Sequence, residues 1–319
     1  MVTEHAKVDN LILNTTRTPT QSTVRQSRVL LGMGLAALAM FLFASQDAIT
    51  KTLVQQMPIS TVLVTRYTAF AIFATVLAAW TMKGGLKAAV KTNNFLGQCF
   101  RGLILVGEIF VFSWGVRHLD MGLNHALFSV FPLVITAMAG PFLGEKVGIW
   151  RWSAVLIGFL GALIVIRPGF DIPSPYVIFP IIAACMYASY NIVTRMTGRS
   201  ADSFQTSLFY LGVVGWFAIL PFGIVQWQQP AGDQIWLLGL LCMTSIAGHS
   251  ALIAALMFAS ASAIQPLNYL LLVFATAIGI VVFGESLELW TTIGASIIVA
   301  SGLFIIVRER LNKSPDDKV

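Results

Sequence analysis

Long apolar stretches alternate with short polar or helix-breaking pieces along almost the whole chain. Each stretch has the roughly 17 to 25 residues that a helix needs to cross a hydrocarbon core of about 30 Å. We predict ten membrane-spanning helices, at residues 30–53, 59–80, 97–117, 120–142, 149–167, 174–195, 205–226, 235–257, 262–284 and 290–307. The breaks contain turn residues, as in KGG at 83 and RPGFDIPSP at 167. The pattern therefore predicts an all-α integral membrane protein.

Composition supports this class and narrows the chemistry. The chain is 57% hydrophobic and only 11% charged, and its mean hydropathy is +0.80, whereas about a quarter of the residues of a soluble domain are charged. Cys99, Cys185 and Cys242 lie in apolar surroundings without CxxC spacing. They indicate neither disulfides nor a metal site, and no cofactor is expected.

The chain has a net charge of +6, and the distribution of its basic residues indicates its orientation in the membrane. If the N-terminus is cytoplasmic, nearly all Lys and Arg residues fall in internal loops and tails, and the external loops hold only Arg117 and Arg167. This imbalance is the positive-inside rule, so the charge does not indicate a nucleic-acid partner. We expect a multi-pass protein of a bacterial inner membrane with both termini cytoplasmic.

The two ends of the chain are polar. Residues 1–28 are rich in Thr, Ser and Gln and are predicted to be a disordered cytoplasmic tail, and residues 309–319 a second cytoplasmic tail. An alternative for the first apolar run is a signal peptide cleaved near Ala44. The internal repeat disfavours that alternative, because Ala44 belongs to a motif that recurs later.

Two pairs of segments show that the chain is duplicated. FASQDAITKTL at 43–53 matches YASYNIVTRMT at 187–197, and FLGEKVGIW at 142–150 matches VFGESLELW at 282–290, at offsets of 144 and 140 residues. We predict two five-helix repeats, 29–168 and 169–308. Because five is odd, the second repeat enters the bilayer from the opposite side. Inverted repeats are typical of secondary transporters, which bind solute near the midplane and work by alternating access.

Charged residues inside the predicted spans are the first candidates for a site. At a helix centre an Asp, Lys or Arg costs about 2.5 to 3.5 kcal/mol, so such residues must pair, snorkel or face water. Asp47 and Arg66 lie at similar depths in adjacent helices, and we predict that they pair, with Lys51 as a second cation on the same face. The alternatives are a structural brace for the pair and a snorkelling position for Lys51. Asn191 and Tyr210 occupy the equivalent positions of the second repeat, and this asymmetry favours a functional role.

Glu108 and His249 form a second candidate pair near the middle of the membrane. The repeat offset places them opposite each other in the third and eighth spans. We predict that they contact a polar substrate or couple transport to protons. The alternative is that each bonds to a neighbouring helix. His125, nearer the external end, is a weaker candidate.

Aromatic and proline residues add to the predicted cavity. Trp114 and Tyr269 are expected to line it, and Asn191 is retained as a substrate or coupling residue. Pro132 and Pro266 lie inside predicted spans, where the lost backbone hydrogen bonds would kink the helix. Small-residue runs such as GFLGA at 158 are helix-packing faces, and a homodimer is one use for them.

The chain resembles the drug/metabolite transporter superfamily, EamA type, over residues 29–308. The specific segments are LGEKVGIWRWSAVLIGFLGALIVIRPG at 143–169 and QPLNYLLLVFATAIGIVVFGE at 265–285, and the D-A-I-x-K pattern at 47–51 is also similar. The resemblance implies ten helices in two inverted repeats and transport of a small metabolite. Some members carry riboflavin, which suits an aromatic cavity.

Other functions remain as alternatives. An exporter of amino acids, drugs or other metabolites by proton antiport has the same general features. An intramembrane enzyme is not expected, because HExxH, GxSxG and paired intramembrane aspartates are missing from the sequence. A channel would favour rings of like charge, whereas single charges occur here in asymmetric positions. The predicted partners are therefore a small solute, the lipid bilayer and a proton or counter-substrate.

Overall fold

A computed structural model describes residues 21–144, 148–167, 174–197, 202–259 and 264–312. Within those ranges the chain is helical and contains no strand. Ten of its helical spans are long and apolar enough to cross a membrane, which confirms the predicted number.

The helices of the first half are α2 (Gln21–Gln56), α3 (Ile59–Thr81), α4 (Gly85–Val90), α5 (Phe95–His118), α6 (Met121–Phe128), α7 (Phe131–Leu143) and α8 (Ile149–Ile166). Those of the second half are η1 (Pro175–Val177), α9 (Ile178–Thr197), α10 (Phe204–Val225), α11 (Gly232–Phe258), η3 (Gln265–Tyr269), α13 (Leu270–Phe283) and α14 (Leu289–Asn312). Two spans consist of more than one piece: α6 with α7, and η3 with α13.

The structure shortens the predicted disordered tail at the N-terminus and lengthens the last predicted span. Residues 21–28 belong to α2, and α14 continues to Asn312. Extending an existing helix adds one hydrogen bond for each residue that it orders, so polar residues beside an apolar span readily join its helix. The remainder of the tails, residues 1–20 and 313–319, lies outside the described residues.

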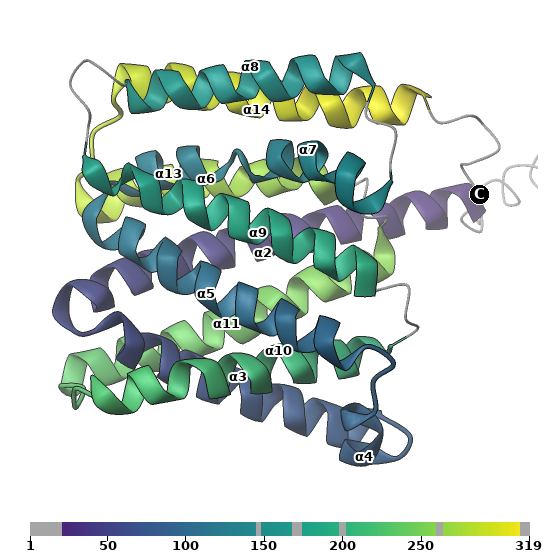
Figure 1. The fold of residues 1–319 in the computed structure, drawn as a ribbon, viewed down its shortest axis with the longest axis vertical. Helices are drawn as coiled ribbons and strands as arrows, with labels where there is room; N and C mark the ends of the chain where they lie inside the picture. The colour runs from purple at the N-terminus through teal and green to yellow at the C-terminus, as the bar shows by residue number, and fades with distance from the viewer. Residues whose placement is uncertain (1–20, 145–147, 168–173, 198–201, 260–263, 313–319) are drawn as a thin grey trace, which may run out of the picture.

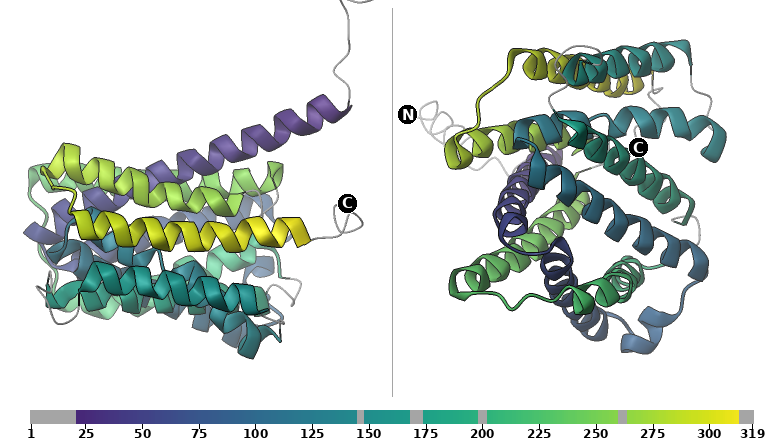
Figure 2. Two further views of the ribbon diagram at one scale, coloured as in Figure 1. Left: turned by 90° about the horizontal axis from the view of Figure 1, so that it is seen from above. Right: turned by 60° about the vertical axis from the view of Figure 1, so that its left-hand side comes forward.

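Helix packing follows the duplication. α3 packs against its repeat equivalent α10, and α8 packs against its equivalent α14. The contact of α2 with α11 has its counterpart in that of α9 with α5. Figures 1 and 2 show the α8–α14 pair as a layer along one side of the bundle. The beginning of α2 and the end of α14 lie on the same side, at the right in Figure 1.

Proline interrupts two of the spans, as predicted. Pro132 stands in the first turn of α7, directly after the break at residues 129–130, and Pro266 begins the 3₁₀ turn η3. Proline has no N–H to donate, so the preceding turn loses its regular hydrogen bonding. Both breaks lie in equivalent spans of the two repeats.

Two glycines bring α8 and α14 into close contact. A methyl group at Gly161 would lie 2.9 Å from the carbonyl oxygen of Gly294, and Gly294 in turn faces the backbone of Gly161. Only residues without a side chain allow two helix backbones to approach this closely.

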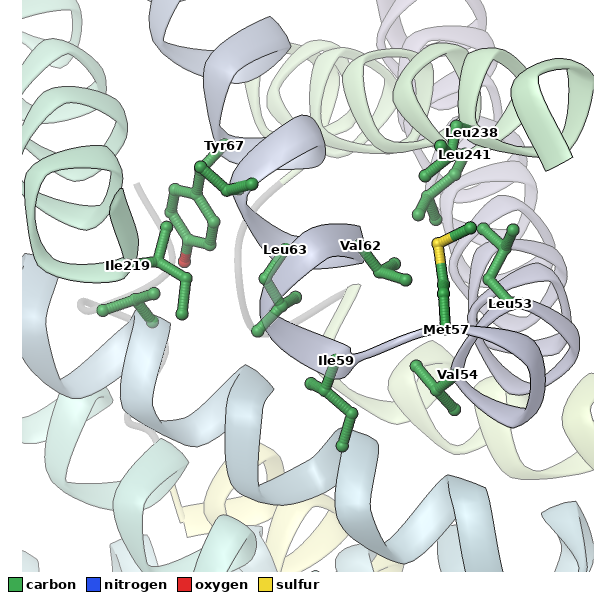
Figure 3. Close-up of a cluster of buried hydrophobic side chains, with 12 residues drawn as sticks. Leu53, Val54, Met57, Ile59, Val62, Leu63, Tyr67, Ile219, Leu238 and Leu241 are labelled. Atoms are coloured by element: carbon green, nitrogen blue, oxygen red, sulfur yellow. The ribbon is translucent and has the colours of Figure 1, made fainter. Parts of the chain in front are cut away.

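Apolar packing closes the end of the bundle where α2 turns into α3. Leu53, Met57 and Leu63 are almost completely buried there, together with Leu241 from α11 and Ile219 from α10 (Figure 3). The cluster therefore combines helices from both repeats. Large apolar side chains such as Leu156 are exposed on the outside of the bundle, as expected for a surface in lipid.

Candidate functional site

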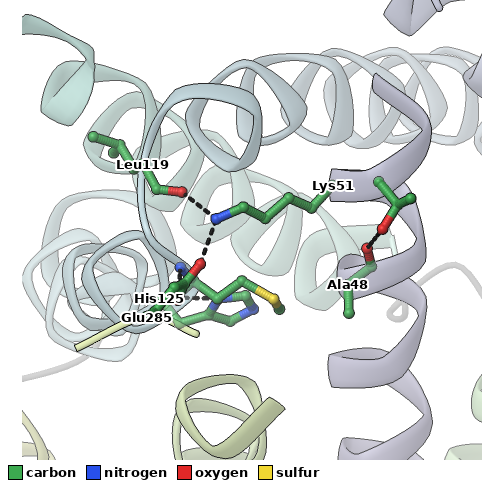
Figure 4. A network of polar contacts seen from close by, with 7 residues as sticks. Ala48, Lys51, Leu119, His125 and Glu285 are labelled. Carbon is green, nitrogen blue, oxygen red and sulfur yellow. Dashed lines mark hydrogen bonds and ion pairs between the residues drawn. The ribbon is translucent and has the colours of Figure 1, made fainter. Parts of the chain in front are cut away.

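Lys51 and Glu285 form a buried ion pair between the two repeats. Lys51 Nζ contacts Glu285 Oε1, and both side chains are 8% exposed. Lys51 also donates to the Leu119 carbonyl oxygen at 2.9 Å, and the Met121 N–H donates to Glu285 Oε2 at 2.8 Å (Figure 4). We call these four residues the latch. The latch joins α2, the α5–α6 turn and the α13–α14 turn.

The α2–α3 hairpin adds further polar contacts at the latch end. Ser60 Oγ donates to Gln226 Oε1 at 2.9 Å, and Thr61 Oγ1 donates to the Gln226 carbonyl oxygen at 3.1 Å. Gln234 Nε2 donates to Gln56 Oε1 at 3.1 Å. Each contact again crosses between repeats, so this end of the bundle is closed by polar bonds beside the apolar cluster.

Asp47 lies one helical turn before Lys51 and contacts His125. The distance from Asp47 Oδ2 to His125 Nε2 is 3.1 Å. The other ring nitrogen, His125 Nδ1, lies 2.9 Å from the Met121 carbonyl oxygen. His125, the weaker histidine candidate in the sequence, is therefore a direct partner of Asp47.

The predicted Asp47–Arg66 pair is wrong. Among the described residues Arg66 Nε donates to Ser245 Oγ at 3.2 Å, and no ion pair joins it to Asp47. Two residues need similar depths in the membrane to meet, but depth does not determine which way each helix faces. α2 packs mainly against α11 and α13, whereas α3 packs against α10. Helices joined by a short hairpin need not be packing partners.

Glu108 occupies the space between these groups. It is 5% exposed and lies within electrostatic range of Asp47 and Arg66. In the described part of the chain no hydrogen bond or ion pair involves its carboxyl group. The buried hydroxyl of Tyr67 also has no hydrogen-bond partner there, and it lies within electrostatic range of both Arg66 and Glu108. We call Asp47, Arg66, Glu108 and Tyr67 the charged centre.

His249 is close to the charged centre but does not pair with Glu108. Its Nδ1 lies 2.8 Å from the Ser245 carbonyl oxygen, and its ring packs edge-on against Phe43 at 5.0 Å. Arg66 is within electrostatic range of both His249 and Glu108. Arg66, the predicted partner of Asp47, therefore lies near both members of the predicted Glu108–His249 pair.

Trp114 lies in a set of near-parallel rings. Its ring centroid is 5.7 Å from that of His118 and 6.0 Å from that of Phe179, and His118 stacks on Tyr176 at 3.8 Å. We call these four residues the ring stack. It connects the end of α5 with the beginning of α9, and a flat aromatic solute could add to such a stack by the same face-to-face contact.

The remaining candidates make local contacts. Asn191 Nδ2 donates to the Tyr187 carbonyl oxygen on its own helix at 2.7 Å. Tyr269 packs against Gly302 of α14, and its buried hydroxyl has no partner in the described structure. Among the described residues neither forms a hydrogen bond with the charged centre, and both stay predicted substrate residues.

The opposite end of the bundle is also joined by polar contacts. Asp202 accepts hydrogen bonds from the Asn93 N–H and from Gln98 Nε2, both at 2.9 Å. Burial opposes ionisation, but these bonds and one from Thr92 outweigh it and lower the pKa of Asp202. Beside them Arg101 is 4% exposed and donates to the Ser207 carbonyl oxygen at 2.7 Å.

A polar pocket of about 220 Å³ opens beside the latch. Its lining includes Asp120, Glu285 and Glu288. Burial, followed by the neighbouring Glu285 carboxylate, raises the pKa of Asp120. A second space of about 720 Å³ lies between α3, α10 and α11 and is lined mainly by apolar residues such as Val64 and Leu220. Its lining has no charged residue, so it does not extend the charged centre.

Sequence reasoning missed three contributors: Glu285 as a partner of Lys51, Ser245 as a partner of Arg66, and Met121 as the residue that connects His125 to Glu285. A signal existed only for Glu285, because the repeat places it in a GE motif. Its equivalent, Glu145, lies outside the described residues.

Comparison with known proteins gives consistent relatives. A sequence profile described as the EamA-like transporter family matches residues 30–167 and again residues 174–307. The chain is 33% identical to a riboflavin transporter of Vibrio cholerae, over 78% of this chain and 83% of the relative. It is 27% identical to an S-adenosylmethionine uptake transporter of Rickettsia felis, over 70% of this chain and 76% of the relative.

A solved crystal structure has the same fold. It matches with a TM-score of 0.59 at 16% sequence identity and covers 90% of this chain and 99% of that one. The helical arrangement is therefore shared with an experimentally determined structure.

Proposed function

The chain belongs to the EamA-like transporter family as a multi-pass membrane protein, and from that premise we propose that it carries a flat, ring-bearing metabolite of the riboflavin type by alternating access. The predicted family resemblance is thereby confirmed. Substrate and mechanism are the further steps that the proposal adds.

The charged centre carries the proposal. Asp47, Arg66 and Glu108 come from three helices and are drawn inward, although each costs several kcal/mol to place away from water. Ser245, from the second repeat, completes the contacts of Arg66. A charged group that is buried where two repeats meet is what a solute site between rocking halves requires.

The proposed orientation follows the positive-inside rule. With both termini cytoplasmic, the latch end faces outward and the Asp202 end faces the cytoplasm. Both ends hold contacts between the repeats, and alternating access would open one set while the other remains closed. The proposed location is a bacterial inner membrane.

Riboflavin suits the polar groups of the charged centre. The imide edge of its isoalloxazine ring presents one N–H donor flanked by carbonyl acceptors. Glu108 could accept from the N–H, while Arg66 and the Tyr67 hydroxyl could donate to carbonyl oxygens. The similarity to riboflavin transporters of Vibrio cholerae and of Brucella anthropi, the second at 28% identity, supports the same choice.

S-adenosylmethionine is a second candidate, because Asp47 and Glu108 would attract its positive charge. The similarity to Rickettsia uptake transporters supports it. The two candidates differ in charge, so Glu108→Gln should strongly reduce exchange of riboflavin and reduce exchange of S-adenosylmethionine still further.

Proteoliposome counterflow tests the proposal. Vesicles loaded with unlabelled riboflavin should accumulate labelled riboflavin transiently and saturably, and S-adenosylmethionine should be measured in parallel. Glu108→Gln should abolish or strongly reduce the exchange, whereas Glu288→Gln, a change at a half-exposed residue of the α13–α14 turn, should retain it. Lack of exchange for both compounds would rule out both substrate assignments.

A further inference from the structure

The ring of His125 is held at both nitrogens. The residue is 1% exposed, and Nδ1 lies 2.9 Å from the Met121 carbonyl oxygen. A carbonyl oxygen can only accept a hydrogen bond, so Nδ1 must carry a hydrogen. Nδ1 is therefore protonated, and the remaining question is whether a proton also lies between Nε2 and Asp47.

One proton must lie between His125 and Asp47. Nε2 is 3.1 Å from Asp47 Oδ2, a normal hydrogen-bond distance. If neither group held a proton there, the nitrogen lone pair would face a carboxylate oxygen in a buried place. The contact is therefore either an imidazolium with a carboxylate or a neutral imidazole with a carboxylic acid. Both forms are neutral overall and hold one removable proton.

The proton is next to the latch. Asp47 and Lys51 are four residues apart on α2 and so share one helical face. Met121 links the two pairs through its peptide groups, since its carbonyl oxygen faces His125 and its N–H donates to Glu285. Loss of the proton would leave the Asp47–His125 pair with an uncompensated negative charge beside Lys51, where Asp47 would compete with Glu285 for the ammonium group.

Titratable and charged groups of both signs surround the pair. The titratable groups of the surrounding elements are Lys51 on α2, Arg66 on α3, Glu108 on α5, Asp120 at the start of α6, Tyr187 on α9 and Glu285 in the α13–α14 turn. Glu108, Asp120 and Glu285 are carboxylic acids, Lys51 and Arg66 are cations, and Glu108 is within electrostatic range of Asp47.

We propose that Asp47 and His125 form the proton-binding site of a proton-coupled carrier, and that the bound proton keeps the Lys51–Glu285 latch closed. The inference rests on the proposed transport function and assigns the coupling ion and its residues. It replaces Glu108 and His249 as the coupling pair. In the transport cycle, a proton taken up at Asp47–His125 closes the latch end, and its release opens that end.

The first test measures proton movement with riboflavin as the probe. Proteoliposomes that contain a trapped pH-sensitive dye should show a pH change when riboflavin flux begins, and His125→Gln should lose that change while retaining exchange. His249→Gln is the matched control, because His249 also bonds through Nδ1 to the carbonyl oxygen four residues before it, but among the described residues no carboxylate bonds to its Nε2. It should keep the ratio of protons to riboflavin unchanged. An unaltered ratio in His125→Gln overturns the proposal.

The second test needs no substrate. The Met121 N–H stands in the first turn of α6, where it has no helical partner, and it donates to Glu285. The rate of its deuterium exchange therefore shows whether the latch is closed. After correction for intrinsic rates, exchange should become about ten- to a hundredfold faster as pH rises, the factor for losing a hydrogen bond to a charged acceptor.

The deuterium-exchange measurement also separates the coupling proposal from the proposed transport of riboflavin. His125→Gln should remove the pH dependence of Met121 exchange, and Glu285→Ala should make exchange fast at every pH. If Met121 exchange in the unmodified protein does not change with pH, the coupling proposal is wrong even where riboflavin exchange succeeds. If riboflavin exchange fails but Met121 exchange follows the expected pattern, the proton site stands and only the substrate assignment falls.

Discussion

The two repeats of this chain share their packing but not their charges. The first repeat has Asp47, Arg66 and Glu108 in its spans, while the second has Asn191 and Tyr210 at the first two equivalent positions. Asn191 bonds to its own helix, and Tyr210 donates to the Val90 carbonyl oxygen at 2.7 Å. The second repeat supplies partners instead, among them Ser245 and Glu285.

This difference separates two demands on a duplicated protein. Packing between equivalent helices, such as α3 with α10 or α8 with α14, requires both copies to keep compatible surfaces. A solute site requires only one set of charges, and a second set would add cost in the membrane. The first repeat thus holds most of the buried charges, among them Lys51, Arg66 and Glu108, and variants at equivalent positions test whether it also carries the function.

The largest effect is expected for Lys51 against its equivalent, Arg195. Lys51→Met leaves Glu285 buried without its cation, which should cost about 3 to 5 kcal/mol in stability and abolish transport. Arg195 is exposed, so Arg195→Met should change stability by less than about 1 kcal/mol. Unfolding in detergent and counterflow of the two variants measure the contrast. The double variant Lys51→Glu with Glu285→Lys should recover part of the lost stability. Equal effects of Lys51→Met and Arg195→Met would contradict the division between the repeats.

The next effect concerns Arg66 and Tyr210. Arg66→Met removes the cation between Glu108 and His249 and should abolish riboflavin exchange. Tyr210→Phe loses one hydrogen bond near α4 and should cost about 1 kcal/mol with exchange retained. Initial rates of counterflow in vesicles with matched protein content decide the matter. Loss of exchange in Tyr210→Phe would show that the second repeat also carries essential polar groups.

A third comparison concerns a place where the repeats should behave alike. Gly161→Ala and Gly294→Ala each put a methyl group against the facing backbone, so each should destabilise by about 1 to 3 kcal/mol. Gly239, which has no atom within 4 Å of an added methyl group, is the control. Gly239→Ala should be neutral or slightly stabilising, because alanine is the better helix former. Thermal unfolding of all three variants in one detergent makes the comparison.

The smallest effect is expected for the contribution of Asp202 to the pH dependence of stability. Its pKa is lowered in the folded state by hydrogen bonds, so its contribution to stability is present above the unfolded pKa and is lost as pH falls through the folded value. The unmodified protein should therefore lose stability in acid relative to Asp202→Asn. The difference at neutral pH should be about 1 kcal/mol. Unfolding midpoints of both proteins, measured from neutral to acid pH, would show parallel curves if Asp202 made no such contribution.

Periodicity and hydropathy were sufficient for the fold. Every predicted span corresponds to a helix or a broken helix, because a bilayer requires a continuous apolar length that is visible in a single sequence. The interruptions at Pro132 and Pro266 were also visible, since proline alters the backbone wherever it stands. The ends of α2 and α14 were missed because helices continue into polar sequence without an apolar signal.

Contacts within the site were less predictable. Lys51 and Glu285 are 234 residues apart, and His125 meets Asp47 only because α6 lies beside α2 in the folded bundle. Sequence position gave the depth of Asp47 and Arg66 but not the rotation of their helices. Trp114 and Tyr269 were chosen by residue type, and their surroundings depend on Phe179 and Gly302, which no local pattern connects to them.

The latch also restricts how such a chain could have arisen. Lys51 belongs to one half and Glu285 to the other, so an ancestor of half the length could have made this contact only as an antiparallel pair of identical subunits. Such a pair would require the subunit to enter the membrane in both orientations, and gene fusion would assign one orientation to each copy. After fusion, the closing contacts at the two ends were free to diverge in strength, a freedom that identical subunits do not have.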